Sequence, residues 1–300
     1  MKQLRILSGL FLLAFPFLTA TAGTLSSTPS ATYITDGSLV PDAGLFVGLG
    51  GSYNSVYLNQ SIEASGVSSI FIDSILAGNG EAGGTASPFK DTDSTFAPQA
   101  QIGYFRHFSD TDYLWGFKYF YQYLGTTISN DSFSVPQSGA YTSFISADTF
   151  TGNVVITSAQ TSINHEMALM PFIGRSFKKS YVYLGVGPAL FETETNIYGA
   201  NGYADLNGIH TDITGSPTNF SDSNWVWGGA AQIGLDYYLN PTWFVDFNYT
   251  YARSADFDNH FESAFSSSTA ALSDTGTLYV NPSQHVTTQT FAITINKVFT

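Results

Sequence analysis

The sequence comprises 300 residues with a formal net charge of −13 and no cysteine. Charged residues make up 11% of the chain and aromatic residues 16%, which is too few charges for an ordinary soluble surface and too many aromatic side chains for disorder. The acidic balance argues against a nucleic-acid partner, and without cysteine no disulfide can stabilise the fold.

Residues 1–22 have the pattern of a secretory signal peptide. Two basic residues precede an apolar run, and Ala20 and Ala22 form a small-x-small cleavage site. A membrane anchor is the weaker interpretation, because the run is short for a membrane span and contains a proline. We expect cleavage after Ala22, followed by a flexible N-terminal segment, 23–42, that is rich in Ser, Thr and Pro.

Beyond that segment, residues 43–300 are predicted to form one domain of alternating strands. The pattern is clearest in 113–126, where an aromatic series that begins with Tyr113 and Trp115 occupies one face and Lys118 lies on the other. Such period-two alternation produces a strand with one apolar and one polar face. The eight segments that follow this pattern are 44–57, 95–107, 113–126, 162–177, 181–194, 225–239, 242–255 and 289–299.

The scarcity of charges decides which face of these strands is outside. A soluble barrel or sandwich points its apolar face inward and needs charged side chains on its outer face. Residues 44–57 contain no charge, and 113–126 contain only Lys118. The favoured arrangement therefore has lipid outside and polar side chains inside.

The connections between the eight segments alternate strictly between short and long. Short turns are expected around 108–112, 178–180 and 240–241, and long links over 58–94, 127–161, 195–224 and 256–285. Outer-membrane barrels sort their connections in this way, whereas soluble β proteins have no reason to do so. The predicted fold class is an all-β, eight-stranded antiparallel transmembrane β-barrel with short periplasmic turns and long extracellular loops.

The end of the chain carries a further pattern. Phe291, Ile293, Ile295 and Phe299 occupy one face of the last strand. Together with the signal peptide and the eight alternating segments, this pattern resembles the small outer-membrane β-barrel proteins of the OmpA, OmpX and opacity type. The resemblance implies location in the bacterial outer membrane, contact with its lipid and lipopolysaccharide, and recognition of the last strand by the outer-membrane assembly machinery. We expect the chain to act as a monomer.

The strand phases place a polar cluster inside the barrel. Its charged and amide members are Lys118, Glu166, Asp236, Asp246, Gln99, Gln101 and Gln232. Because buried charges need partners, Lys118 is expected to pair with one or more of the carboxylates. An eight-stranded barrel has just enough room for its own side chains, which favours a filled core. A narrow water path lined by the same residues is the alternative.

No residue pattern points to a catalytic, cofactor or metal site. His165 and Glu166 are adjacent, but strand alternation puts them on opposite faces, which argues against a catalytic dyad. The long links carry most of the acidic residues, and loops are where binding specificity usually resides. The leading hypothesis is a non-enzymatic structural or surface-interaction protein, an adhesin or virulence factor whose acidic loops meet a host or surface ligand. A narrow channel and a lipid-A-modifying enzyme are the alternatives.

Overall fold

The computed structural model describes residues 38–144, 146–206, 208–268 and 272–300. The predicted signal peptide, with its cleavage site at Ala20 and Ala22, and most of the predicted N-terminal segment lie outside the described residues. In the part of the chain that the structure describes, no helix is long and apolar enough to cross a membrane.

The described residues form twelve β-strands. Their bounds are β1 Ala43–Ile72, β2 Ile75–Thr85, β3 Phe89–His107, β4 Tyr113–Ser143, β5 Ala147–Ser176, β6 Ser180–Leu206, β7 Ile209–Asp212, β8 Thr218–Asn240, β9 Trp243–Ser254, β10 Phe257–Asp258, β11 Phe261–Ser268 and β12 Leu272–Phe299.

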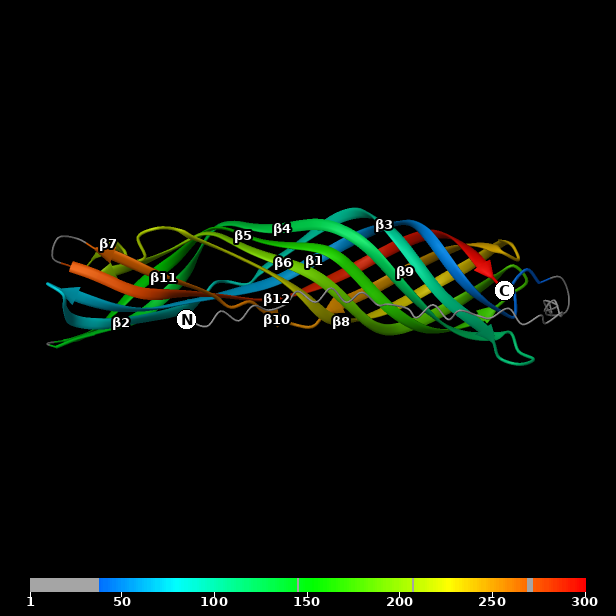
Figure 1. Cartoon of the computed structure of the whole chain (residues 1–300), viewed down its shortest axis with the longest axis horizontal. Helices are drawn as coiled ribbons and strands as arrows, with labels where there is room; N and C mark the ends of the chain where they lie inside the picture. Colours follow the sequence, from blue (N-terminus) through cyan, green and yellow to red (C-terminus); the bar gives the residue numbers. More distant parts are fainter. Residues whose placement is uncertain (1–37, 145, 207, 269–271) are drawn as a thin grey trace, which may run out of the picture. The chain divides into compact units, whose positions relative to one another are not determined.

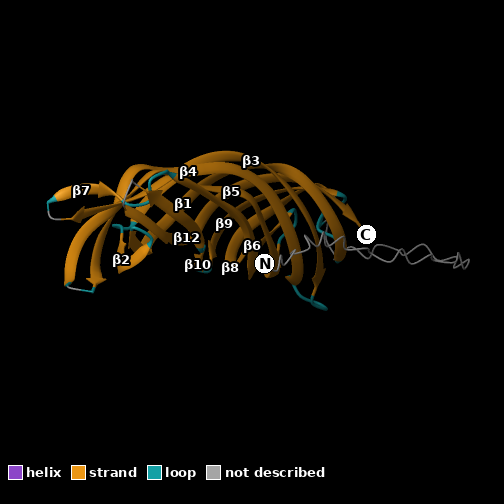
Figure 2. Cartoon of the chain, turned by 60° about the vertical axis from the view of Figure 1, so that its left-hand side comes forward, coloured by secondary structure: helices purple, strands orange, loops and turns teal. Residues whose placement is uncertain are grey.

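Eight of these strands close into a ring. Going round the wall, the order is β1, β3, β4, β5, β6, β8, β9, β12 and back to β1, with every neighbouring pair antiparallel. The closing ladder joins the first strand to the last, from Leu45 opposite Phe299 to Ile72 opposite Leu272. Figures 1 and 2 show these strands wrapping around a common axis. The predicted eight-stranded antiparallel barrel is confirmed.

Short turns lie together at one end of the ring, which we call the turn end. They follow β3, β5 and β8 and occupy residues 108–112, 177–179 and 241–242. At the same end, residues 38–42 do not run free as the predicted flexible segment would. Val40 is fully buried, and the Leu39 amide donates to the Lys178 carbonyl at 2.8 Å. The last residues of the predicted segment are therefore packed against the barrel.

The four long links are largely strands, and this corrects the sequence-based strand boundaries. We call residues 58–94, 127–161, 195–224 and 256–285 the extension. Within it β1, β3, β4, β5, β6, β8 and β12 continue, and β2, β7, β10 and β11 lie entirely there. In Figure 1, β2, β7 and β11 lie at the opposite end from the C-terminus. These segments are rich in Gly, Ser and Thr, so their strands depend on pairing with neighbours and have little alternation of their own.

The outer surface of the ring is apolar over a continuous belt. One example from each ring strand, between 39 and 83% exposed, is given by Leu49, Phe96, Trp115, Ile173, Leu184, Ile233, Phe247 and Ile293. A strand that crosses lipid at a tilt needs roughly 9–11 residues, and the outward aromatic series of β4 from Tyr113 to Tyr123 has that length. A surface of this kind must meet hydrocarbon and not water. The chain is therefore a transmembrane β-barrel.

Both borders of the belt carry side chains suited to a membrane–water interface. At the turn end, the Lys297 ammonium lies 5.7 Å from the centre of the Trp243 ring and 5.5 Å from that of Phe299. At the other border, the rings of Tyr53 and Phe96 pack at 5.1 Å. Immediately beyond, the outer surface becomes polar, with Ser55, Asn59, Thr92, Arg253, Thr287 and Gln289 around one shallow groove.

A lysine placed inside the belt should destabilise the barrel more than the same lysine just outside it. We expect Ile293→Lys to lower the free energy of unfolding by about 2–4 kcal/mol, because its ammonium would lie in hydrocarbon. Thr287→Lys, on the same strand beyond the belt, is the matched control and should have little effect. Urea unfolding in lipid vesicles, followed by tryptophan fluorescence, measures both. Equal losses in the two variants would contradict the position of the belt.

Candidate functional site: the barrel interior and a cavity in the extension

The interior of the ring is closed at the turn end by a layer of aromatic and aliphatic side chains, here called the aromatic plug. Its buried members are Val40, Phe46, Phe105, Leu114, Phe172, Tyr181, Tyr183, Tyr238, Phe244 and Val298. The rings pack in edge and stacked arrangements, as in Phe46 on Phe244 at 5.4 Å and Tyr238 on Phe244 at 5.1 Å. Sequence alternation predicted a small and polar inner face, so this aromatic layer was not anticipated.

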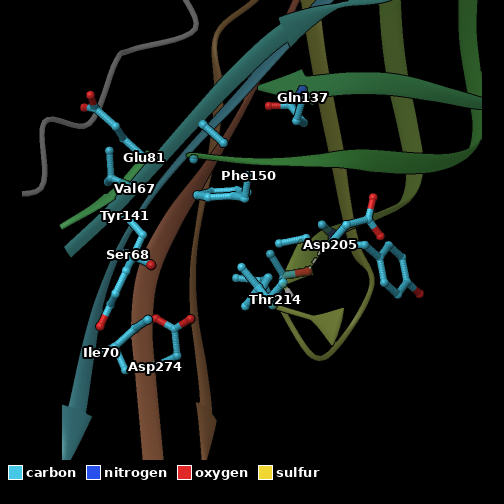
Figure 3. A pocket seen from close by; sticks show the side chains of 18 of the residues that line it. Val67, Ser68, Ile70, Glu81, Gln137, Tyr141, Phe150, Asp205, Thr214 and Asp274 are labelled. Carbon is cyan, nitrogen blue, oxygen red and sulfur yellow. Dashed lines mark hydrogen bonds between the residues drawn. The ribbon is translucent and has the colours of Figure 1, made fainter. Parts of the chain in front are cut away.

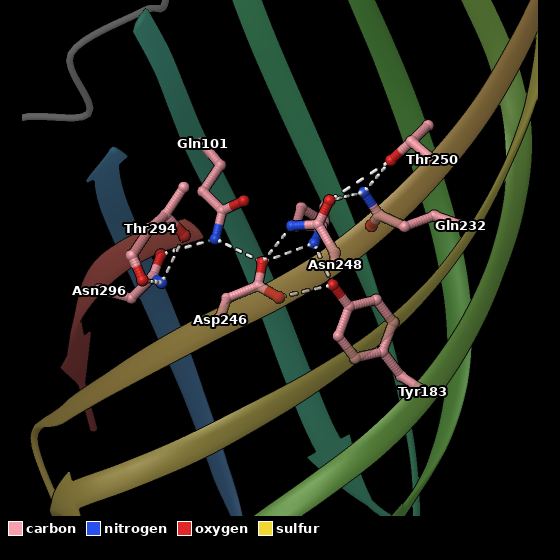
Figure 4. A network of polar contacts seen from close by, with 9 residues as sticks. Gln101, Tyr183, Gln232, Asp246, Asn248, Thr250, Thr294 and Asn296 are labelled. Atoms are coloured by element: carbon pink, nitrogen blue, oxygen red, sulfur yellow. Dashed lines mark hydrogen bonds and ion pairs between the residues drawn. The ribbon is translucent and has the colours of Figure 1, made fainter. Parts of the chain in front are cut away.

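A charged network lies inside the barrel, centred on the Asp246 carboxylate (Figure 4). Lys118 donates to Asp246 at 2.9 Å, and both side chains are almost fully buried. Tyr183 donates to the second oxygen of Asp246 at 2.9 Å and accepts from Lys118 at 2.5 Å. Gln101 and Asn248 each donate to Asp246 at 3.0 Å. One carboxylate thus receives hydrogen bonds from four side chains, which offsets much of the cost of its burial.

The Lys118–Asp246 ion pair spans the lumen. Lys118 belongs to β4 and Asp246 to β9, and these strands stand on opposite sides of the ring. An ion pair of 2.9 Å between opposite walls divides the lumen at this level. The network continues through Asn248 to Gln232, whose amide donates to Asn248 at 3.1 Å, and through Gln101 to Asn296 at 2.7 Å.

The other predicted interior residues are buried but lie beside this network. Asp236 stands directly opposite Asp246 in the β8–β9 ladder. Glu166 is fully buried opposite Gln122 in the β4–β5 ladder. Gln122 belongs to a second polar cluster, in which it accepts from Ser52 at 2.9 Å. Gln99 is also buried. Among the described residues the interior therefore holds the carboxyl groups of Glu166, Asp236 and Asp246, and Lys118 is the buried basic partner of Asp246.

Apolar side chains fill the lumen above the charged network. One buried group contains Phe120, Met170 and Phe191, and another contains Leu58, Leu124 and Ile163. All six are at most 2% exposed. The barrel interior is a packed core with polar layers, as expected for a ring of this size.

The histidine of the adjacent His–Glu pair points away from the interior. His165 lies on the outer wall, with Nε2 3.2 Å from the Glu192 carboxylate and Nδ1 2.7 Å from the Tyr121 hydroxyl. Its ring also stacks at 6.2 Å on Trp225. Because Glu166 is fully buried on the inner face, His165 and Glu166 do not form a dyad.

The assembly-signal residues of the sequence all lie on the outer face. Phe291, Ile293, Ile295 and Phe299 are between 51 and 61% exposed and belong to the apolar belt. Phe291 packs against Tyr249 of the neighbouring strand, with ring centres 4.8 Å apart. Their position fits contact with lipid. Recognition by the assembly machinery stays a prediction.

A cavity of about 390 Å³ lies inside the extension, and sequence reasoning missed it (Figure 3). Its walls come from all four segments of the extension, for example Ile70, Phe150, Tyr203 and Leu278. These segments were predicted as irregular loops, so no wall could be assigned to them. The glycines and aromatic residues scattered through these segments face each other only once the strands are paired, as Gly139 and Phe150 do.

No protein-family model matches the chain, and no curated protein sequence matches it significantly. Among solved structures, it is similar to the outer membrane protein OprG from Pseudomonas aeruginosa, at 14% identity and a TM-score of 0.34, over 87% of this chain and 99% of that one. It is also similar to Ail, the attachment invasion locus protein of Yersinia pestis, at 13% identity and a TM-score of 0.24, over 79% of this chain and 98% of that one. Its similarity to Neisserial surface protein A is 11% identity with a TM-score of 0.29, over 81% of this chain and 97% of that one. Such low TM-scores add nothing to what the strand pairing itself establishes.

Removing the buried lysine should be costly, because it leaves Asp246 and Asp236 without their cation. We expect Lys118→Met to lower the free energy of unfolding by about 3–5 kcal/mol. Adding Asp246→Asn should recover part of this loss, since one uncompensated charge is then removed. The control is Lys90→Met at an exposed position of β3, which should change stability by less than about 0.5 kcal/mol. Denaturant unfolding compares the three, and a double variant weaker than Lys118→Met would contradict the pairing.

Proposed function

We propose that this chain is an outer-membrane protein of a diderm bacterium, with a sealed barrel that holds a β-structured binding surface outside the cell. The observation that carries the proposal is the combination of a closed lumen with ring strands that continue far beyond the apolar belt. Lys118 and Asp246 join opposite walls, and the aromatic plug lies below them. A transport pore would need the space that these side chains occupy, whereas an anchor does not.

The charge distribution supports an orientation and a type of partner. Apart from histidines, Lys90 is the only basic residue within the extension, and all its other charged residues are acidic. Basic residues instead gather toward the turn end, where Arg106, Arg175 and Lys297 lie close to the border of the belt. They are well placed for anionic phospholipid headgroups on the periplasmic side. The acidic extension would then face outward and favour a cationic partner surface.

The described side chains favour a binding role, because the adjacent His165 and Glu166 lie on opposite faces of their strand. Among the described residues, no group of three or more His, Asp or Glu side chains is arranged to hold a metal ion. The proposed activity is a surface interaction, as in an adhesin or virulence factor.

The sealed lumen predicts that the purified protein conducts no ions. In planar lipid bilayers we expect no discrete conductance steps, because the aromatic plug and the Lys118–Asp246 pair fill the lumen. Bilayers treated with detergent alone serve as the baseline. Reproducible unit steps that the baseline lacks would support the channel alternative and contradict the sealed anchor.

The acidic extension should bind cationic surfaces in a salt-dependent manner. Cells displaying the protein are expected to capture beads coated with a lysine-rich peptide. The triple variant Glu63→Gln, Asp91→Asn, Asp258→Asn removes exposed charges from three strands of the extension and should reduce capture several-fold. High salt should remove most of the remaining difference.

The matched control for that experiment neutralises acids at the turn end, with Asp110→Asn and Asp112→Asn. It should capture beads as well as the original protein does. Compact migration of the unboiled protein on a gel verifies that each variant keeps its barrel. Equal capture by all variants at low salt would contradict an interaction through the acidic extension.

A further inference from the structure

The cavity in the extension lies above the apolar belt, and the rings of Phe150 and Phe265 form two parts of its wall. Phe150 lies over Gly139 and Phe265 lies over Gly276, each ring against the backbone of a neighbouring strand. A Cβ atom at either glycine would come within 2.4 Å of the facing ring, so both positions require glycine. Rings held in this way form fixed walls and not a loosely packed core.

The cavity is acidic and contains no basic side chain among the described residues that line it. Glu81, Asp148 and Asp205 are exposed and stand at its margin, whereas Asp274 is only 9% exposed. Figure 3 shows Asp274 on the wall opposite Thr214 and Asp205. Asp205 is hydrogen-bonded to the His210 imidazole, whose Nδ1 lies 2.7 Å from its carboxylate. Asp274 has no such basic neighbour among the described residues of the cavity lining, whereas Lys118 pairs with Asp246 in the barrel interior.

Asp274 has an unused binding capacity. Its Oδ1 atom is buried and has no hydrogen-bond partner among the described residues, and the same holds for Oδ1 of Asn153 on another wall. Burial raises the pKa of the Asp274 carboxyl above its ordinary value, although the Ser68 hydroxyl that hydrogen-bonds to it acts in the opposite direction. A buried, incompletely paired carboxyl is unfavourable for folding, and a bound cation would offset that cost.

The chemistry of the walls selects an organic cation over an inorganic one. Calcium and magnesium prefer six or more oxygen ligands, and no suitable group of acids is present among the described residues. An ammonium group with an apolar body needs one carboxylate and aromatic surface, which can also contribute cation–π attraction. Asp274, Phe150 and Phe265 provide this combination in one cavity.

The wall beside this space has a seam at which no strand ladder crosses. In the described residues, β7 pairs only with β6 and β11 only with β12, so no ladder joins them. Side chains bridge the seam lower down, where Asn259 donates to Asp222 at 2.9 Å and Phe220 stacks on Phe261 at 5.2 Å. Residues from both sides of the seam, such as Thr214 and Phe265, line the cavity.

We propose that this cavity is a binding site for an amphipathic organic ammonium ion. Its ammonium group would donate to Asp274, its apolar body would lie against Phe150 and Phe265, and the acids at the margin would attract it. The site goes beyond the proposed surface interaction and does not depend on it, because a small ligand can bind whether or not a macromolecular partner does.

Binding can be measured with three probes of similar shape and different charge. These are tryptammonium, its neutral alcohol analogue tryptophol, and the anionic analogue indole propionate, each titrated calorimetrically into the full-length mature protein in lipid nanodiscs. Signals from empty nanodiscs are subtracted. Tryptammonium should bind about tenfold more tightly than tryptophol, the contribution expected of one charge-assisted hydrogen bond. Indole propionate should not bind.

The variant Asp274→Asn keeps the shape of the side chain and removes its charge. It should weaken tryptammonium binding about tenfold while leaving tryptophol binding unchanged. Asp110→Asn, an exposed acid at the turn end, is the matched control and should change neither. Ala204→Phe, at a buried position of the lining, should weaken both probes by filling the space.

Two results would overturn the proposal. One is equal affinity for the cationic and anionic probes, which would mean that the acids play no part. The other is unchanged tryptammonium binding in Asp274→Asn. Because this substitution is nearly isosteric, it remains informative even if Ala204→Phe fails to fold, and gel mobility without boiling checks folding in every variant.

Discussion

The structure depends on one constraint, which is that every backbone amide and carbonyl within the apolar belt must find a partner in the sheet. Lipid offers no hydrogen bonds, so a sheet can cross it only as a closed ring. The β1–β12 ladder, which begins at Leu45 and Phe299, provides that closure. The outer face of this closed ring contacts lipid, and its inner face contacts the opposite wall. This arrangement explains why apolar residues point outward, why polar groups point inward and why short turns lie at one end.

Strand positions within the belt could be predicted from the sequence because lipid imposes strict alternation there. Leu45, Val47 and Leu49 must all point outward, and any slip of one residue would bury them and expose their polar neighbours. The extension carries no such pressure. Its outer face meets water, so Gly, Ser and Thr serve on both faces. Its strands are set by partners distant in sequence, such as Ser68 opposite Gly276, and these cannot be read from local periodicity.

The sequence allowed us to predict which polar residues point into the barrel, but not which of them face each other across the lumen. Alternation alone placed Lys118, Glu166, Asp236 and Asp246 inside, but only the ring order shows that β4 and β9 face each other across the lumen. That arrangement lets Lys118 reach Asp246 and leaves Glu166 beside a separate polar cluster. The aromatic plug was missed because its residues, such as Phe105 and Tyr181, belong to strands that are apolar on both faces near the turn end.

The same constraint explains why the cavity lies where it does. Inside the belt, an open seam would leave amides and carbonyls unpaired in hydrocarbon, so the ring has to be complete. Above the belt, water can satisfy a free strand edge, and β7 and β11 are left unjoined. Only there can the wall open without a large penalty and admit a ligand from the side. The border of the apolar belt therefore separates two parts of this chain, the closed ring that anchors it in lipid and the extension that can form a binding surface.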